Sequence, residues 1–224
     1  MFKKAARHQS KMRLALIGPS GSGKTYSSLL IAKGLGGSIA MIDTERGSGS
    51  LYADTTPYDV CELDPPFTPE TYIQAIREAE SAGYDILVID SLSHAWAGQG
   101  GILEFVDKAT QSLKNNFAAW REASPKHNSL VDAILGSRCH VIATMRSKTA
   151  WEVQKDERTG KTKPVKIGLA PVQRDGLEYE FTVVLELSMD GHVATASKDR
   201  TGLFDGQFIV PEVETGAQLK LWLS

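Results

Sequence analysis

The feature that most restricts the fold of this chain is a glycine-rich loop between a short apolar run and a helical pattern. Residues 18–25 read Gly-Pro-Ser-Gly-Ser-Gly-Lys-Thr and fill every fixed position of the pattern G-x-x-x-x-G-K-[ST]. The preceding run, 13–17, suits a buried strand, and residues 25–35 place apolar side chains at helical spacing. Strand, loop and helix in this order are the context in which the pattern binds phosphate. A glycine-rich turn that matches by chance is the alternative, and this context argues against it.

Each part of the loop has a chemical role in binding a triphosphate. The glycines let the backbone curl so that N–H groups point at phosphate oxygens, and the following helix presents its positive end to the same anion. Lys24 supplies a charge for the β- and γ-phosphates, and Thr25 offers a hydroxyl to Mg²⁺. The cofactors implied are ATP and Mg²⁺. The residues expected to bind the nucleotide are Gly18, Pro19, Ser20, Gly21, Ser22, Gly23, Lys24, Thr25 and Tyr26.

Acidic residues end two further predicted strands. Asp90 closes the apolar run 84–90, a pattern that holds Mg²⁺ directly or through water. Ligands of parallel sheets bind outside the carboxyl ends of the strands, so we expect Asp90 to share the metal with Thr25. Glu45 follows the strand 38–43, where a glutamate can orient or deprotonate the water that attacks the γ-phosphate. A solvated loop acid is the alternative for Glu45.

Two polar residues stand at the end of the fourth predicted strand, 139–144. Thr144 and Arg146 are expected at the same sheet edge as the phosphate loop. A polar side chain there can sense the γ-phosphate and pass its loss to the following loop. An ordinary strand end is the alternative at equal weight.

The rest of the chain alternates strands and helices. Helices are expected at 69–82, 101–122 and 127–137, with Pro125 separating the last two. The last third instead predicts an antiparallel pair, 181–187 with 192–196, and a closing helix at 215–222. The pattern therefore predicts an α/β fold with a mainly parallel, doubly wound sheet and antiparallel C-terminal strands.

Length and composition fit one globular domain. The chain has 224 residues, of which 42% are hydrophobic and 23% charged. We expect residues 1–12 to form a basic N-terminal arm and 13–224 a single core domain. No run reaches the ~18 apolar residues of a membrane span, and the N-terminus lacks an apolar signal core. Cys61 and Cys139 are most simply free thiols, so we expect a cytoplasmic location without membrane contact.

The order of these parts resembles the RecA-like recombinase fold, and most closely the phage RecA-like single-strand annealing ATPases of the Sak type, within the AAA/P-loop NTPase superfamily. The resemblance covers nearly the whole chain. The stretches that carry it are 18–25, 43–45, 86–93, 143–148 and 168–181, of which the last is the more diagnostic.

The resemblance implies an ATPase of DNA recombination that acts as an oligomer, either a ring or a filament, in the cytoplasm of a bacterial host. Glu45 then takes the role of the catalytic glutamate beside Lys24. Lys198 and Arg200 resemble a K-x-R finger that reaches the γ-phosphate of the neighbouring subunit. A basic turn after a strand is the alternative for this pair. Phe2 and Ala5 match a short F-x-x-A docking pattern, although a basic arm is the interpretation that we favour.

A local excess of positive charge marks the expected site for single-stranded DNA. Between residues 146 and 174 stand eight basic and three acidic residues, although the whole chain carries a net charge of −2. Gly160 reads as the tip of a hairpin whose flanks, 150–153 and 164–167, can pair. Salt-dependent binding with little sequence preference would follow from backbone contacts. The residues expected to contact DNA are Lys148, Trp151, Lys155, Arg158, Lys161, Lys163 and Lys166, with His94 and Trp96 in a second loop.

Three functions remain open at this stage. The first is the DNA-stimulated ATPase that anneals or pairs single strands, for which a single-strand DNA-binding protein is a further candidate partner. The second is a RecA-like nucleotide switch or motor accessory that acts on a protein without binding DNA. A small-molecule kinase ranks last, because the sequence shows no arginine-rich lid and no acceptor-binding pattern. For the DNA loops, solvated hairpins and tryptophans packed on the domain are the alternative.

Overall fold

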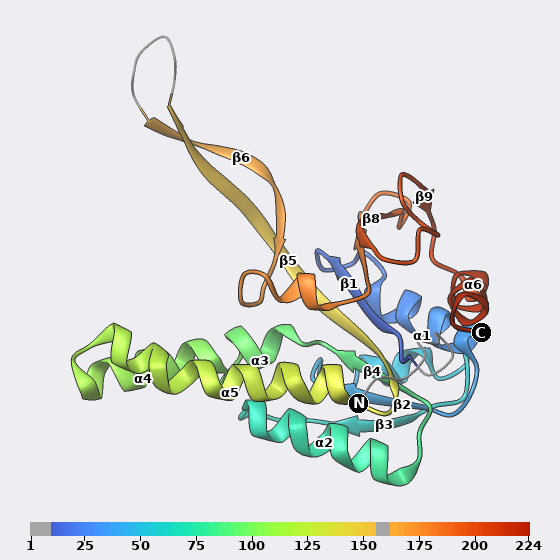
Figure 1. Cartoon of the computed structure of the whole chain (residues 1–224), viewed down its shortest axis with the longest axis horizontal. Coiled ribbons are helices and arrows are strands. Elements are labelled where there is room, and N and C mark those ends of the chain that lie inside the picture. Colours follow the sequence, from blue (N-terminus) through green and yellow to red (C-terminus); the bar gives the residue numbers. More distant parts are fainter. Residues whose placement is uncertain (1–9, 156–161) are drawn as a thin grey trace, which may run out of the picture.

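A computed structural model describes residues 10–155 and 162–224 of the chain, without the side chains of 149–155 and 162–169. These residues form a nine-stranded sheet flanked by helices (Figure 1). The strands are β1 (Arg13–Gly18), β2 (Ile39–Asp43), β3 (Asp59–Glu62), β4 (Ile86–Asp90), β5 (His140–Lys155), β6 (Thr162–Pro171), β7 (Val183–Leu187), β8 (Ala194–Asp199) and β9 (Phe208–Ile209). The helices are α1 (Lys24–Leu35), α2 (Pro69–Ala82), α3 (Ser93–Ala97), α4 (Ile102–Leu113), α5 (Asn116–Gly136) and α6 (Val213–Leu223), with 3₁₀ turns η2 (Gly49–Tyr52) and η3 (Leu177–Glu180).

The sheet has the order β3-β2-β4-β5-β1-β7-β8-β9, and β6 pairs with β5. All neighbours from β3 to β7 are parallel, whereas β7, β8 and β9 pair antiparallel. One strand, β5, therefore lies between the strand that enters the phosphate loop and the strand that ends at Asp90. The predicted fold, a mainly parallel sheet with antiparallel C-terminal strands, is confirmed.

Alternate residues of the central strands build two separate cores. Leu14 and Leu16 of β1 pack in a cluster with side chains of α1 and α6, such as Leu29 and Leu219. The residues between them on β1 pack in a second cluster with α2 and α5. Both faces of the sheet are thus covered, which explains why the central strands are almost continuously apolar. Figure 1 shows the two helical layers on opposite sides of the sheet.

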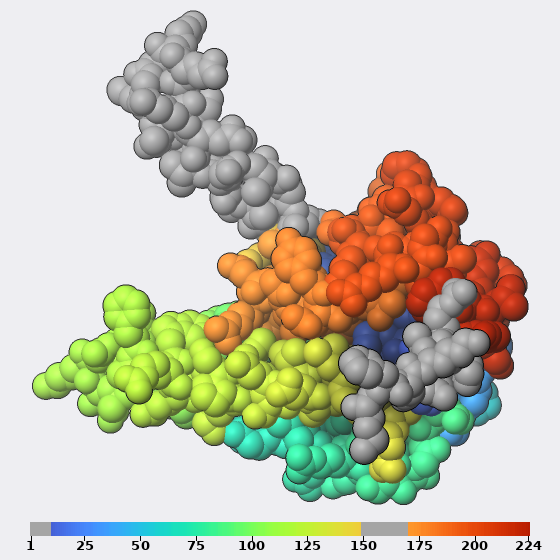
Figure 2. Space-filling view, viewed as in Figure 1, coloured from blue at the N-terminus to red at the C-terminus, as the bar shows by residue number. Residues whose placement is uncertain are grey.

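The helical region after α3 differs from the prediction. The expected break at Pro125 is wrong, because Pro125 lies inside the 21-residue helix α5. The chain turns instead at Lys114, which has a left-handed backbone (φ 50°), and Asn115 caps α5 by accepting the Ala118 N–H at 3.1 Å. A proline removes one helical hydrogen bond, and the packing of α5 against α2 and the sheet outweighs that loss. Figure 2 shows the far ends of α4 and α5 as a narrow projection from the molecule.

The strand predicted at 139–144 is much longer than expected. β5 continues to Lys155 and pairs with β6 as an antiparallel ribbon that leaves the sheet (Figure 1). Residues 151–153 pair with 164–166, so the predicted pairing of the two flanks is confirmed. The predicted tip at Gly160 lies outside the described residues. In the described parts of the chain, no helix is long and apolar enough to cross a membrane.

Close packing of α1 against α6 yields a first prediction. A Cβ on Gly34 would lie 1.9 Å from the Val213 carbonyl oxygen, and one on Gly216 would lie 2.1 Å from the Ile31 carbonyl oxygen. We expect Gly34→Ala or Gly216→Ala to destabilise the domain by about 1–3 kcal/mol in denaturant unfolding, because backbone atoms must move apart. Gly136→Ala is the matched control, since its added methyl group would meet no atom within 4 Å. Equal stability of the three variants would contradict this packing argument.

Candidate nucleotide-hydrolysis site

The phosphate loop is shaped for close approach of an anion. Gly21 and Gly23 adopt left-handed backbone conformations (φ 80° and 86°) that side chains disfavour. A Cβ on Gly18 would lie 2.5 Å from Ser22 Oγ, a buried oxygen without a hydrogen-bond partner. Lys24 is 9% exposed, and its Nζ donates to the Pro19 carbonyl at 2.7 Å. Burial lowers the pKa of Lys24, whereas the nearby carboxylates, led by that of Asp90, oppose this shift.

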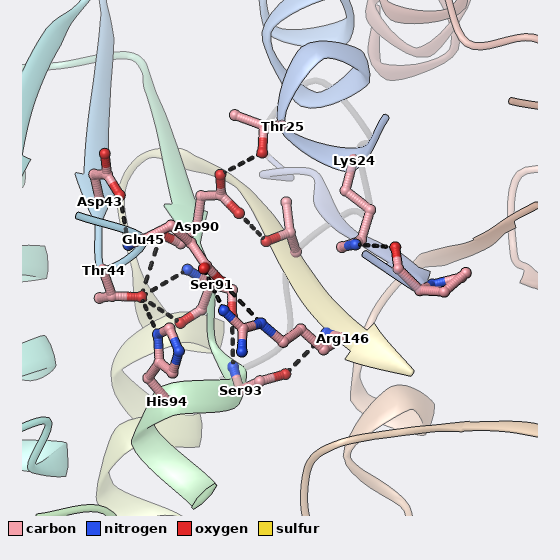
Figure 3. A network of polar contacts seen from close by, with 12 residues as sticks. Lys24, Thr25, Asp43, Thr44, Glu45, Asp90, Ser91, Ser93, His94 and Arg146 are labelled. Carbon is pink, nitrogen blue, oxygen red and sulfur yellow. Dashed lines mark hydrogen bonds and ion pairs between the residues drawn. The ribbon is translucent and has the colours of Figure 1, made fainter. Parts of the chain in front are cut away.

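A buried carboxylate joins the loop to two strands. Asp90 is 2% exposed, and its Oδ2 accepts the Thr25 hydroxyl at 2.6 Å. Its Oδ1 accepts the Thr144 hydroxyl from β5. Burial raises the pKa of Asp90, and the two hydroxyl donors act in the opposite direction. The structure thus brings together the two predicted metal ligands, Thr25 and Asp90 (Figure 3). Thr144, one of the two predicted sensors, bonds to the same carboxylate.

Glu45 lies beside these residues and is held by Arg146, the other predicted sensor. The Arg146 Nε donates to Glu45 Oε1 at 3.0 Å, and a terminal nitrogen of the same guanidinium pairs with Oε2. The Arg146 backbone N–H also donates to Ser93 Oγ at 2.9 Å. Figure 3 shows the guanidinium between the Glu45 loop and the start of α3. The predicted glutamate and the predicted sensor are therefore direct partners.

The residues predicted in a second DNA loop have other contacts in the structure. Residues 93–97 form the short helix α3, with His94 stacked on Phe67 at a centroid distance of 5.0 Å. His94 Nδ1 lies 2.7 Å from Thr44 Oγ1, and burial lowers the pKa of the imidazole. Trp96 is 8% exposed because Trp120 and His127 pack on its ring. Trp96 thus packs on the domain, which is the alternative for this tryptophan, and it presents no free face to DNA.

A buried glutamine, which the sequence did not single out, fixes the other root of the ribbon. Gln173 is 2% exposed, and its side chain donates to the Leu92 carbonyl at 3.1 Å. The Leu92 N–H in turn donates to the Thr144 carbonyl at 2.9 Å. Both ends of the ribbon thus contact the segment that follows Asp90. A lone glutamine between Val172 and Arg174 carries no pattern that would predict this burial.

A cleft of about 820 Å³ opens beside the phosphate loop. Tyr26, which follows the loop, and Tyr52, at the end of η2, form an aromatic pair there, with ring centroids 5.7 Å apart. The opposite wall comes from His192 and the segment that enters α6. The lining residues are Gly21, Gly23, Tyr26, Ser27, Leu30, Tyr52, His192, Val210, Pro211, Glu212, Val213 and Glu214.

The donor set suits Mg²⁺ bound together with a phosphate. Thr25 and Asp90 provide the hard oxygen atoms that this ion prefers. Within residues 10–155 and 162–224, no three His, Cys, Asp or Glu side chains gather as a metal site. Mg²⁺ commonly keeps one or two protein ligands and takes its others from phosphate and water, so the residues present fit the ion.

Comparison with known proteins agrees with this geometry. The AAA domain family matches residues 10–208. The chain belongs to the AAA domain family. A crystal structure of the RadB recombinase is similar over 85% of this chain and 83% of that chain, with 20% sequence identity and a TM-score of 0.43. No curated protein matches the chain. This AAA domain carries the phosphate loop of a P-loop NTPase between β1 and α1.

The predicted finger lies far from the phosphate loop of its own AAA domain. Leu187, at the end of β7, lies beside the start of the loop, and β8 runs back from Ala194 to Asp199 at the opposite sheet edge. The Arg200 N–H donates to the Thr182 carbonyl at that edge, and the Arg200 side chain is exposed. Lys198 Nζ donates to the Tyr179 carbonyl. Any contact of this pair with a γ-phosphate would therefore have to be made in another subunit.

The basic ribbon is described by its strands alone. Lys148 is exposed at the root of the ribbon. The backbones of Trp151, Lys155, Lys163 and Lys166 lie in β5 and β6, but their side chains fall outside the described part of the chain. Arg158 and Lys161 lie outside the described residues. Their contact with DNA stays a prediction.

Burial of Asp90 yields a second prediction. A carboxyl group whose pKa is raised by folding destabilises the domain as pH rises above its unfolded pKa. At neutral pH we expect Asp90→Asn to raise the stability of the nucleotide-free protein and to abolish the extra thermal stabilisation by Mg²⁺ with ATP. Asp190→Asn, an exposed carboxylate in the turn after β7, should change neither value. A destabilised Asp90→Asn protein that still responds to Mg²⁺ would contradict both parts.

Proposed function

We propose that this AAA domain hydrolyses ATP with Mg²⁺ as an oligomeric recombination protein of the RecA-like, Sak-type group, and that it anneals or pairs single-stranded DNA. The observation that carries the proposal is the grouping of Glu45, Arg146 and the Thr25–Asp90 pair at the root of the β5–β6 ribbon. Arg146 belongs both to this site and to β5, the first strand of the candidate DNA arm.

Binding of the nucleotide uses two adjoining regions. The phosphates lie on the loop, where Lys24 and the start of α1 supply positive charge. The base and ribose enter the cleft beside it, where Tyr26 and Tyr52 offer aromatic faces. Thr25 and Asp90 would hold Mg²⁺, which would supply positive charge to the phosphates.

Hydrolysis requires Glu45 to leave Arg146. In the structure two nitrogens of the Arg146 guanidinium engage both oxygens of the Glu45 carboxylate, so the carboxylate faces Arg146 rather than a water molecule. Once Arg146 turns to the γ-phosphate, Glu45 is free to orient the attacking water and accept its proton. Arg146 thereby links the presence of the γ-phosphate to the activation of Glu45.

The same arginine connects chemistry to the ribbon. The Arg146 carbonyl accepts the Val172 N–H at 2.7 Å, so it is part of the first ribbon pairing. Gln173 follows directly and bonds to the Leu92 carbonyl. Movement of Arg146 between Glu45 and phosphate therefore changes the root of the arm that carries the basic residues. Single-stranded DNA bound along that arm would bias the same movement, which is how DNA stimulates hydrolysis.

Completion of the site by a second subunit gives the third prediction. Lys24→Ala removes the phosphate contact and should abolish ATP binding, whereas Arg200→Ala should bind ATP and not hydrolyse it. Mixing the two inactive proteins should restore turnover, because an intact loop then meets an intact finger across some interfaces. Arg138→Ala, an exposed cation at the same sheet edge, is the control and should retain activity. Mixtures that stay inactive would rule out a finger acting between subunits.

Single-stranded DNA provides the fourth prediction. ATP turnover should rise when the oligonucleotide is added. Replacing Lys161 and Lys163 together by glutamine should lower the slope of log affinity against log salt by about 1.4, since each contact on a single strand contributes about 0.7. Replacing Lys108 and Lys114 of the α4 region is the matched control. ATP binding without any retention of DNA would instead favour the nucleotide switch that acts on a protein partner.

A further inference from the structure

The loop that carries Glu45 is folded around the side chain of the residue two positions before it. Asp43 ends β2 and is 1% exposed. Its Oδ1 accepts the Glu45 backbone N–H at 2.6 Å, and its Oδ2 accepts the Gly49 N–H at 2.9 Å. An aspartate whose side chain accepts the N–H group two residues later stabilises a turn of the backbone. One carboxylate thus fixes the beginning and the end of the loop.

The backbone between these two bonds turns tightly. Arg46 and Gly47 both have left-handed conformations, with φ of 56° and 79°. A Cβ on Gly49 would lie 2.5 Å from Met41 Sδ and 3.1 Å from Asp43 Oδ2, so a side chain there would push the loop off the carboxylate. Tyr58 also fixes Gly49, because its hydroxyl donates to the Gly49 carbonyl at 2.5 Å.

The residue between Asp43 and Glu45 is attached to the neighbouring strand. The Thr44 N–H donates to the Asp90 carbonyl at 2.7 Å, and Thr44 Oγ1 accepts the Ser91 N–H at 2.9 Å. These contacts fix where β2 ends, but they do not reach Glu45. The Glu45 backbone N–H is bound by Asp43 alone among these residues. Because both oxygens of the Asp43 carboxylate accept N–H groups of the loop, this carboxylate faces the loop and not a metal site.

We propose that Asp43 is the positioning residue of Glu45, acting through the 44–49 loop without touching nucleotide. The proposal rests on the proposed function, in which Glu45 orients the attacking water. Loss of one of the two hydrogen bonds would loosen the loop and let the Glu45 carboxylate shift from its position. A displacement of about 1 Å of a catalytic group costs on the order of 100-fold in rate, whereas the phosphate loop keeps its shape.

The test compares Asp43→Asn with the wild-type protein. An amide keeps the size of the side chain but presents an NH₂ group to one of the two N–H donors. We expect kcat for ATP to fall by about 100-fold while the dissociation constant for ATP changes far less. Gly49→Ala should reproduce this split with Asp43 intact. Asp85→Asn is the matched control, because Asp85 accepts the Ser38 N–H at 2.8 Å at the far sheet edge.

A second measurement does not depend on hydrolysis. Arg46 is exposed in the loop, so trypsin should cut after it faster in Asp43→Asn and Gly49→Ala, with cutting after Arg77 of α2 unchanged. A wild-type protein without ATPase activity would defeat the proposed function, yet this cleavage would still test the loop. Unchanged kcat, or unchanged cleavage at Arg46 together with a raised Mg²⁺ requirement, would overturn the positioning role.

Discussion

The carboxylate of Asp90 is the contact on which the geometry of the site depends. It accepts one hydroxyl from Thr25 at the start of α1 and another from Thr144 on β5. Its own strand, β4, is separated by β5 from β1, which enters the phosphate loop. Burying a charge beside hydroxyls without a cation in contact is costly, and the raised pKa of Asp90 reflects that cost. In the proposed function, an ion bound there would recover the lost free energy and would couple the stability of the domain to nucleotide and Mg²⁺.

Around this fixed point, the other functional groups differ in how firmly they are held. The phosphate loop and Asp90 belong to elements buried in both cores, so their positions follow from the packing of the whole sheet. Glu45 stands on a loop that hydrogen bonds hold in place, and its half-exposed partner Arg146 is shared with the ribbon. The phosphate site is rigid, whereas the side chain of Glu45 can exchange its partner. Nucleotide binding and activation of Glu45 can therefore respond to different contacts.

The sequence predicted those features that follow from local pattern. Glycine spacing, apolar runs and strand-ending acids identified the loop, Asp90 and Glu45, and the parallel topology brought Thr25, Asp90 and Thr144 to one edge. Pro125 misled the prediction because a proline signal is local, whereas the helix through it is held by distant packing. Trp96 was expected to contact DNA for a similar reason: its sequence neighbours do not reveal that Trp120 and His127 pack on its ring. Two contacts leave no trace in sequence spacing: the Arg146–Glu45 pair, 101 positions apart, and the bond from the Gln173 side chain to the Leu92 carbonyl, 81 positions apart.

The position of Lys198 and Arg200 gives the proposed oligomer a physical reason. Because β8 runs away from the phosphate loop, the two cations stand at the edge of the sheet opposite the Thr25–Asp90 pair, and no rotation of their side chains could bring them back. In its own subunit the site holds two positive groups near the scissile phosphate, Lys24 and Arg146, and the second of these is neutralised by Glu45. A cation supplied by a neighbouring subunit would therefore add positive charge that the isolated subunit lacks. Assembly, the γ-phosphate and the release of Glu45 would then all act on the hydrolysis step.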